Sequence, residues 1–126
     1  MYSIKKEVKI IYDGAVLKVR EALKNEGFGI LTEIDVKATL KKKLNADFDN
    51  YLILGACNPP LAHKALQAEP DLGLMLPCNV IVYEKEGKTF VAAIRPTIQM
   101  QKIGNPQLAL IAAQVEEKLK NVIANV

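Results

Sequence analysis

The sequence predicts an α+β domain in which helices pack on one face of a mainly antiparallel, curved sheet. Strand-like and helix-like stretches alternate through the first half of the chain. Two later strand-like stretches are separated by a turn at Glu86 and Gly87, and the chain ends in a long amphipathic helix. This order is typical of helices laid against an antiparallel sheet. We therefore expect the elements in the order β-α-β-(α)-β-(α)-β-β-α, within a single domain formed by residues 1–126.

The N-terminal part is expected to form one strand and one helix. Apolar and polar residues alternate along residues 2–12, a pattern that indicates a strand with one buried face. Asp13 follows and can cap a helix, because its carboxylate accepts hydrogen bonds from the free amides of the first turn. Apolar residues then recur at helical spacing as far as Leu23, and Gly27 is suited to end the helix in a left-handed conformation.

Two further strands and two helices are expected in the middle of the chain. Residues 28–34 return to strand composition, and residues 51–56 form a continuous apolar run that is typical of a central strand. Asp35 is expected to cap a short helix between them. Asn58 followed by Pro59 is the pattern of a helix start, with the asparagine as cap and the proline at the first helical position.

The C-terminal part is expected to form a hairpin and the last helix. The hairpin strands are Cys78–Glu84 and Thr89–Ile94. Asn105 and Pro106 repeat the helix-start pattern. Apolar residues then recur at intervals of three and four, as in one face of a helix: Leu108, Ile111, Val115, Leu119, Val122 and Val126.

Composition restricts the class of protein. Half of the residues are hydrophobic and a quarter are charged, as in globular domains. The net charge of +3 is too small to indicate nucleic acid as a partner, so none is expected. The N-terminus has no apolar run typical of a signal peptide, and no membrane span is expected. We expect a cytoplasmic protein, with reduced thiols. A sheet covered on one side favours a homodimer through its other face.

The stretch from Tyr51 to Glu84 gathers the residues that could carry chemistry. It contains both cysteines, the only histidine and two Cys-Asn pairs, each beside a proline. Cys57 ends one predicted strand, and Cys78 begins the next. If these strands are antiparallel neighbours, the two thiols meet at one end of the sheet, which we expect to lie near Glu33.

One interpretation of this cluster is a metal site. Cys57, Cys78 and His63 are good ligands for zinc or copper(I), and Glu33 or Asp35 could complete the set. Another soft ligand for copper is Met100. No Cys-x-x-Cys pair is present, however, and His63 is more often a surface or half-buried histidine than a ligand in such a position.

A second interpretation is a thiol-dependent enzyme or redox protein. Cys57 precedes a predicted helix, whose positive N-terminal end favours a thiolate, so Cys57 is the candidate nucleophile and Cys78 the resolving partner. The third interpretation is a structural dimerisation module in which both cysteines only pack, as free cysteines often do. Asn58 and Asn79 could then serve as a helix cap and a turn residue rather than as ligand-binding groups.

The motifs GACNPPLAHKAL and LMLPCNVIVYE, together with ILTEIDV at residues 30–36, closely resemble the family of domain of unknown function 302. The resemblance runs through most of the chain. It implies a compact α+β fold similar to a TATA-binding-protein-like unit with extra helices, and a homodimer. The motif residues map onto Glu33, Cys57, Asn58, Pro77, Cys78 and Asn79. The family has no agreed activity, so the resemblance implies no reaction.

The leading hypothesis is therefore a cytoplasmic homodimer that binds a metal ion or a small ligand. The expected ligands are Glu33, Cys57 and Cys78, with His63 as a further metal ligand and with Asn58 and Asn79 contacting a small molecule. Whether the protein is an enzyme stays open at this point.

Overall fold

The computed structural model describes residues 1–126 and is built around one open five-stranded sheet. The strand order is β1-β5-β4-β3-β2, and every neighbouring pair is antiparallel. The strands are β1 (Ser3–Val8), β2 (Gly29–Asp35), β3 (Tyr51–Cys57), β4 (Cys78–Lys85) and β5 (Lys88–Ile94). The α+β class and the antiparallel sheet predicted from the sequence are confirmed.

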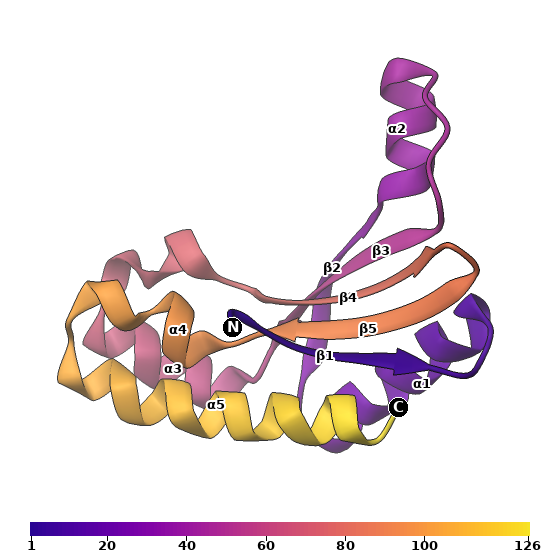
Figure 1. Cartoon of the computed structure of the whole chain (residues 1–126). Coiled ribbons are helices and arrows are strands. Elements are labelled where there is room, and N and C mark those ends of the chain that lie inside the picture. The colour runs from indigo at the N-terminus through magenta and orange to yellow at the C-terminus, as the bar shows by residue number, and fades with distance from the viewer.

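Most helices cover one face or one end of this sheet. Figure 1 shows α1 (Tyr12–Asn25) and α5 (Pro106–Ala124) lying along the same face. Shorter helices gather at one end of the sheet: α3 (Pro59–Ala68), η1 (Pro70–Met75), α4 (Pro96–Gln99) and η2 (Gln101–Ile103). The exception is α2 (Val36–Leu44), which projects away from the body and buries no residue. None of the helices combines the length and the apolar character that a membrane crossing requires.

The buried side chains form two separate hydrophobic clusters. The larger cluster lies between the sheet and the helices α1 and α5, and includes Val19, Leu54, Val80 and Leu119. The smaller cluster lies beneath the short helices at the end of the sheet. It consists of Ala65, Leu72, Met100, Leu108 and Ala112. The seam between the two clusters is where the candidate site lies.

The opposite face of the sheet carries a ladder of aromatic rings from three neighbouring strands. Tyr83 stacks on Tyr51 at 5.2 Å and on Phe90 at 5.3 Å between ring centroids. The Lys5 ammonium lies 4.8 Å from the Phe90 centroid, within cation–π range. Figure 1 shows the helices α1 and α5 on the other side of the sheet, so the ladder stays uncovered.

Three of the four predicted N-terminal helix caps and the hairpin turn are confirmed. The side chains of Asp35, Asn58 and Asn105 each accept a hydrogen bond from an amide in the first turn of α2, α3 and α5. Glu86 and Gly87 have φ angles of 53° and 77°, which are the positive values that a two-residue hairpin turn requires.

The N-terminal boundary differs from the prediction. The first strand ends at Val8, not at residue 12, because Val8 already pairs with Thr89 and β5 begins one residue earlier, next to the hairpin turn. Tyr12 therefore belongs to α1. Asp13 does not cap this helix: Ile11 occupies the cap position without a side-chain hydrogen bond, and Asp13 lies within the first turn.

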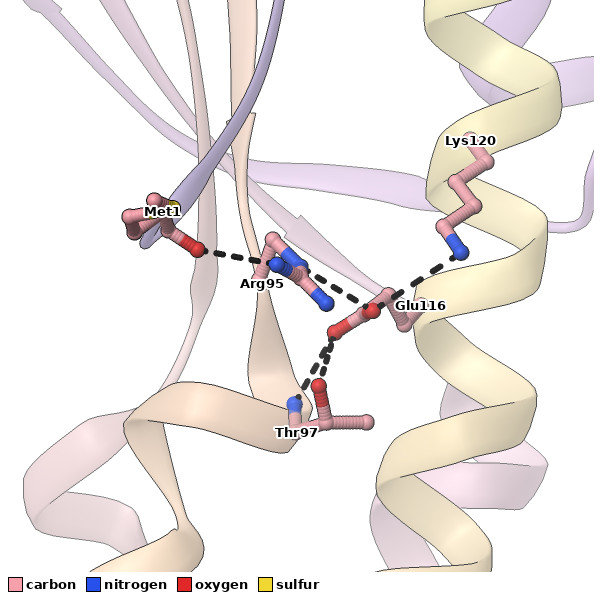
Figure 2. Close-up of polar contacts among 5 residues, drawn as sticks. All are labelled: Met1, Arg95, Thr97, Glu116 and Lys120. Carbon is pink, nitrogen blue, oxygen red and sulfur yellow. Dashed lines mark hydrogen bonds and ion pairs between the residues drawn. The ribbon is translucent and has the colours of Figure 1, made fainter.

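A buried carboxylate joins the last helix to the end of β5 (Figure 2). Glu116 is 4% exposed and accepts hydrogen bonds from Arg95 Nε at 3.2 Å, from the Thr97 amide at 3.1 Å and from Thr97 Oγ1 at 2.5 Å. Lys120 lies 4.0 Å away, and Arg95 also donates to the Met1 carbonyl. Burial alone would raise the pKa of Glu116, but the hydrogen bonds from Thr97 and Arg95 outweigh it and lower that pKa.

Candidate functional site: an apolar cavity with two thiols

The two cysteines lie at the same end of neighbouring strands, as expected. β3 and β4 pair antiparallel with Ala56 opposite Cys78, and Cys57 follows Ala56 as the last residue of β3. Both cysteines are free thiols; Cys78 is buried and Cys57 is partly exposed. The expectation that the strand ends bring the cysteines together is therefore confirmed by the strand register.

Both thiols line a cavity of about 290 Å³ that lies between the two hydrophobic clusters. Fifteen of its 17 lining residues are hydrophobic and none is charged, so the cavity suits an apolar occupant. The lining consists of Phe28, Leu31, Ala56, Cys57, Asn58, Leu61, Ala62, Ala65, Leu66, Leu72, Leu76, Pro77, Cys78, Met100, Ile111, Ala112 and Val115.

Asn58 is the only lining residue with a side-chain amide, and its hydrogen bonds are directed at the protein. Its Oδ1 accepts from the Leu61 amide at 3.3 Å, and its Nδ2 donates to the Glu26 carbonyl at 3.5 Å. Asn79 is exposed and is not among the lining residues. It pairs with Gly55, so it belongs to the uncovered face of the sheet. Asn58 is thus the helix cap that the sequence predicted, and it lines the cavity, whereas Asn79, the other predicted ligand contact, lies outside the cavity.

The two thiols differ in their surroundings. Burial, assisted by the charge of Cys57, raises the pKa of Cys78 to about 11. Cys78 is therefore a neutral thiol at physiological pH. Cys57 lies directly before the cap of α3, at the positive end of a helix dipole. Any thiolate chemistry in this cavity would have to begin at Cys57.

This difference predicts unequal alkylation of the two cysteines in the folded protein. At pH 8 a thiol of pKa about 11 is ionised to roughly one part in a thousand, so Cys78 should react with iodoacetamide roughly 200-fold more slowly than an ordinary free thiol. Mass spectrometry of timed samples measures both sites, and the urea-unfolded protein supplies the reference rates. Equal rates for Cys57 and Cys78 in the folded protein would contradict this assignment.

Glu33 is separated from the cysteines, contrary to expectation. It pairs with Leu54, three residues before Cys57, which is about 10 Å along the strand. Arg20 of α1 donates two hydrogen bonds to its carboxylate, at 3.2 and 2.5 Å, and these lower the pKa of Glu33. The charge of Glu33 is thus balanced by Arg20 on the helix-covered side of the sheet edge.

The other metal-ligand candidates are also dispersed. His63 is exposed on α3 and is not part of the cavity lining, while Asp35 caps α2. No three side chains among the histidine, cysteines, aspartates and glutamates lie close enough together to hold a metal ion. Met100, by contrast, lines the same cavity as Cys57 and Cys78.

Three residues with a clear structural role were not predicted from the sequence. Gly55 lies where a side chain has no room, and Leu31 lies at a β-bulge between Ile30 and Thr32. Nothing local in the sequence indicates either feature. Glu116 could have been found, because it falls on the buried face of the last helix, four residues after Ala112.

Fold and site together define a class: small α+β proteins with an open antiparallel sheet and an apolar, thiol-lined cavity at one end of it. A family model described as "Domain of unknown function DUF302" matches residues 4–126, and the chain belongs to this family. The fold is also that of the crystal structure of an uncharacterized conserved DUF302 protein from Bacillus stearothermophilus, with a TM-score of 0.93 and 31% identity, covering 99% of this chain and 98% of that one. No curated protein sequence matches the chain.

Proposed function

We propose that this protein binds a small apolar molecule in the cavity between its two hydrophobic clusters. The observation that carries the proposal is the composition of the wall: it has no charged residue and one side-chain amide, that of Asn58, and its other residues are apolar or carry sulfur. A polar ligand would lose its hydration there without gaining hydrogen bonds, whereas an apolar ligand gains from leaving water.

The position of the cavity gives such a ligand a structural effect. Ala56 and Cys78 in its wall belong to the larger cluster, and Leu72 and Met100 belong to the smaller one. An apolar ligand in the seam would join the two clusters into one continuous core. Ligand binding should therefore also stabilise the fold, because a ligand that binds only the folded state shifts the unfolding equilibrium.

Naphthalene, a neutral molecule of ten carbon atoms, is a suitable first probe. We expect one molecule to bind per chain and to raise the unfolding temperature. The variant Ala112→Leu adds a larger side chain at the wall and should weaken naphthalene binding at least roughly tenfold, the equivalent of about 1.4 kcal/mol. The measurement is methyl NMR titration together with thermal unfolding.

The matched control is Ala113→Leu, which makes the same change at the next residue of α5 on its exposed side. It should bind naphthalene like the unmodified protein. The proposal fails if naphthalene does not bind, or if the Ala112 and Ala113 variants bind it equally well.

A metal form of the site is supported in one respect only. Cys57, Cys78 and Met100 line the same cavity, and thiol and thioether sulfur are soft ligands that suit copper(I) rather than zinc. Zinc sites are typically four-coordinate with nitrogen, sulfur and carboxylate ligands, and Glu33 and His63 lie elsewhere. Metal analysis of untagged protein, beside the double variant Cys57→Ser, Cys78→Ser, would detect copper held by the thiols.

The enzymatic alternative keeps Cys57 as the nucleophile, supported by its partial exposure and by the helix that follows it. Cys78 is poorly suited to resolve a mixed disulfide, because its raised pKa leaves almost no thiolate at neutral pH. The burial of Cys78, with the raised pKa that it causes, therefore favours ligand binding over a dithiol redox cycle.

We also propose that the protein is a homodimer located in the cytoplasm. The cytoplasm is the compartment in which free thiols stay reduced. The uncovered aromatic ladder supports the dimer, as do the exposed apolar side chains Ile34, Leu44 and Phe48 around the projecting helix α2. Exposed apolar surface of this kind is typical of interaction sites. Sedimentation equilibrium would give the mass of one chain if the dimer is wrong.

A further inference from the structure

We propose that the cavity holds the straight alkyl chain of a single-chain amphiphile, which enters tail first between Leu31 and Leu66. This inference rests on the proposed function, since it names the ligand class and the entrance of the same cavity. It depends on three features: a mouth flanked by exposed leucines, a deeply buried far end, and a wall without charged groups.

The mouth is marked by the two most exposed leucines of the lining. Leu31 is 66% exposed and Leu66 is 38% exposed, yet both line the cavity. Leu31 owes its position to the β-bulge in β2, where the pairing register shifts between Ile30 and Thr32. Bulges redirect side chains and are common beside functional sites. The bulge thus presents an apolar side chain at the entrance, on an edge strand.

The far end of the cavity is closed. Leu72 is 1% exposed, Ala112 is 2% exposed and Met100 is 9% exposed, and all three belong to the smaller hydrophobic cluster. The exposed fraction of the lining side chains therefore falls from Leu31 and Leu66 to the three residues of the smaller cluster. An elongated apolar group fits this gradient, with one end in water and the other in the core.

The chemistry of the wall decides which part of the ligand enters. No charged residue lines the cavity, and its one side-chain amide, that of Asn58, already bonds to the Leu61 amide and the Glu26 carbonyl, so a charged headgroup would find no counter-charge there. Burial of an unpaired charge is unfavourable, and the headgroup therefore stays in water at the mouth. The wall has one aromatic ring, that of Phe28, and is otherwise aliphatic, which suits a flexible chain.

The volume limits the length of the chain. A cavity of roughly 150 Å³ holds benzene, with six carbon atoms, so a cavity of about 290 Å³ holds about twelve by proportion. Each methylene group that leaves water should strengthen binding roughly fourfold until the cavity is full. Affinity should then stop rising, because further methylene groups remain outside.

The test is calorimetric titration with straight-chain alkanoates of six to fourteen carbon atoms, below their micelle-forming concentrations. We expect one site per chain and an affinity that rises with chain length up to about twelve carbon atoms. Ala112→Leu adds three carbon atoms at the closed end, so it should end the rise at a chain about three carbons shorter.

The entrance is tested by Leu31→Ser, which should weaken dodecanoate binding roughly fivefold through the lost apolar contact. Naphthalene, with ten carbon atoms against about twelve for the full cavity, should lose less affinity than dodecanoate. The matched control is Leu17→Ser, on α1 and 68% exposed, which should change the affinity for neither ligand. Because Leu31 and Leu17 are both exposed, neither variant should impair folding.

The outcomes separate this inference from the proposed function. If alkanoate affinity depends on chain length and falls in the Leu31→Ser variant, both the alkyl-chain inference and the proposed function are supported. If naphthalene binds but alkanoate affinity does not depend on chain length, the alkyl-chain inference is overturned and the apolar cavity function stands. The same holds if the Leu31 and Leu17 variants bind dodecanoate equally well. Failure of both naphthalene and the alkanoates to bind overturns both.

Discussion

Replacing Gly55 with alanine should destabilise the protein by about 3 kcal/mol, near the upper end of the usual range for overpacking. A Cβ atom at this position would lie 2.1 Å from Thr32 Oγ1 and 2.6 Å from Pro77 Cγ. Both distances are far below van der Waals contact. Thr32 can rotate, but the ring of Pro77 is rigid, so the strands β2 and β3 or the entry to β4 must move apart.

The measurement is the free energy of unfolding from urea titration. Gly73→Ala is the matched control, because no atom lies within 4 Å of a Cβ at Gly73 and its φ is not positive. That variant should stay within about 0.5 kcal/mol of the unmodified protein. Adding Thr32→Ala to Gly55→Ala should restore only part of the loss, since the contact with Pro77 remains. Equal stability of the Gly55 and Gly73 variants would refute the packing argument.

Replacing Glu116 with glutamine should cost about 1.5–3 kcal/mol, the usual range for hydrogen bonds to a charged group. The substitution keeps the size of the side chain but removes its charge. It also directs an NH₂ group at donors, since Arg95 Nε and both Thr97 donors point at the Glu116 carboxylate (Figure 2). The loss should loosen the junction of β5, α4 and α5.

The pH dependence of the Glu116 effect has a defined sign. Its pKa in the folded protein is lowered from the ordinary value of 4.5, so its stabilisation is complete above pH 4.5 and is lost as the pH falls through the folded-state pKa. The difference in unfolding free energy between the unmodified protein and Glu116→Gln should therefore shrink between pH 6 and pH 3. Glu117→Gln, at the exposed neighbouring position, is the control and should show little difference at either pH.

Local sequence patterns were sufficient for most of the fold. The caps at Asp35, Asn58 and Asn105 and the turn at Glu86 and Gly87 were all correct, because each depends on hydrogen bonds or φ angles within a few residues. The predicted end of the first strand was wrong because it does not depend on neighbouring residues. Its end is set by the length of its partner β5, which is distant in sequence.

The candidate site was predicted only in part. The strand ends with Cys57 and Cys78 were correctly brought together, since antiparallel neighbours place the end of one strand beside the start of the next. Glu33 was expected nearby, but the ion pair with Arg20 and the register of β2 place it farther along the sheet. Which residues share a site along a strand depends on register, and register is a property of the pair rather than of either strand.

The sequence by itself determined the class of fold, the helix boundaries set by caps, and the pair of strand ends that carry the thiols. These features follow from hydrophobic periodicity and short-range hydrogen bonding, both of which depend on residues close together in the sequence. Only the tertiary structure decided that the thiols face an apolar cavity, that a bulge places Leu31 at its mouth and that Gly55 has no room for a side chain. A cavity is the space left between elements, so it depends on how the sheet and helices pack rather than on any one stretch of chain.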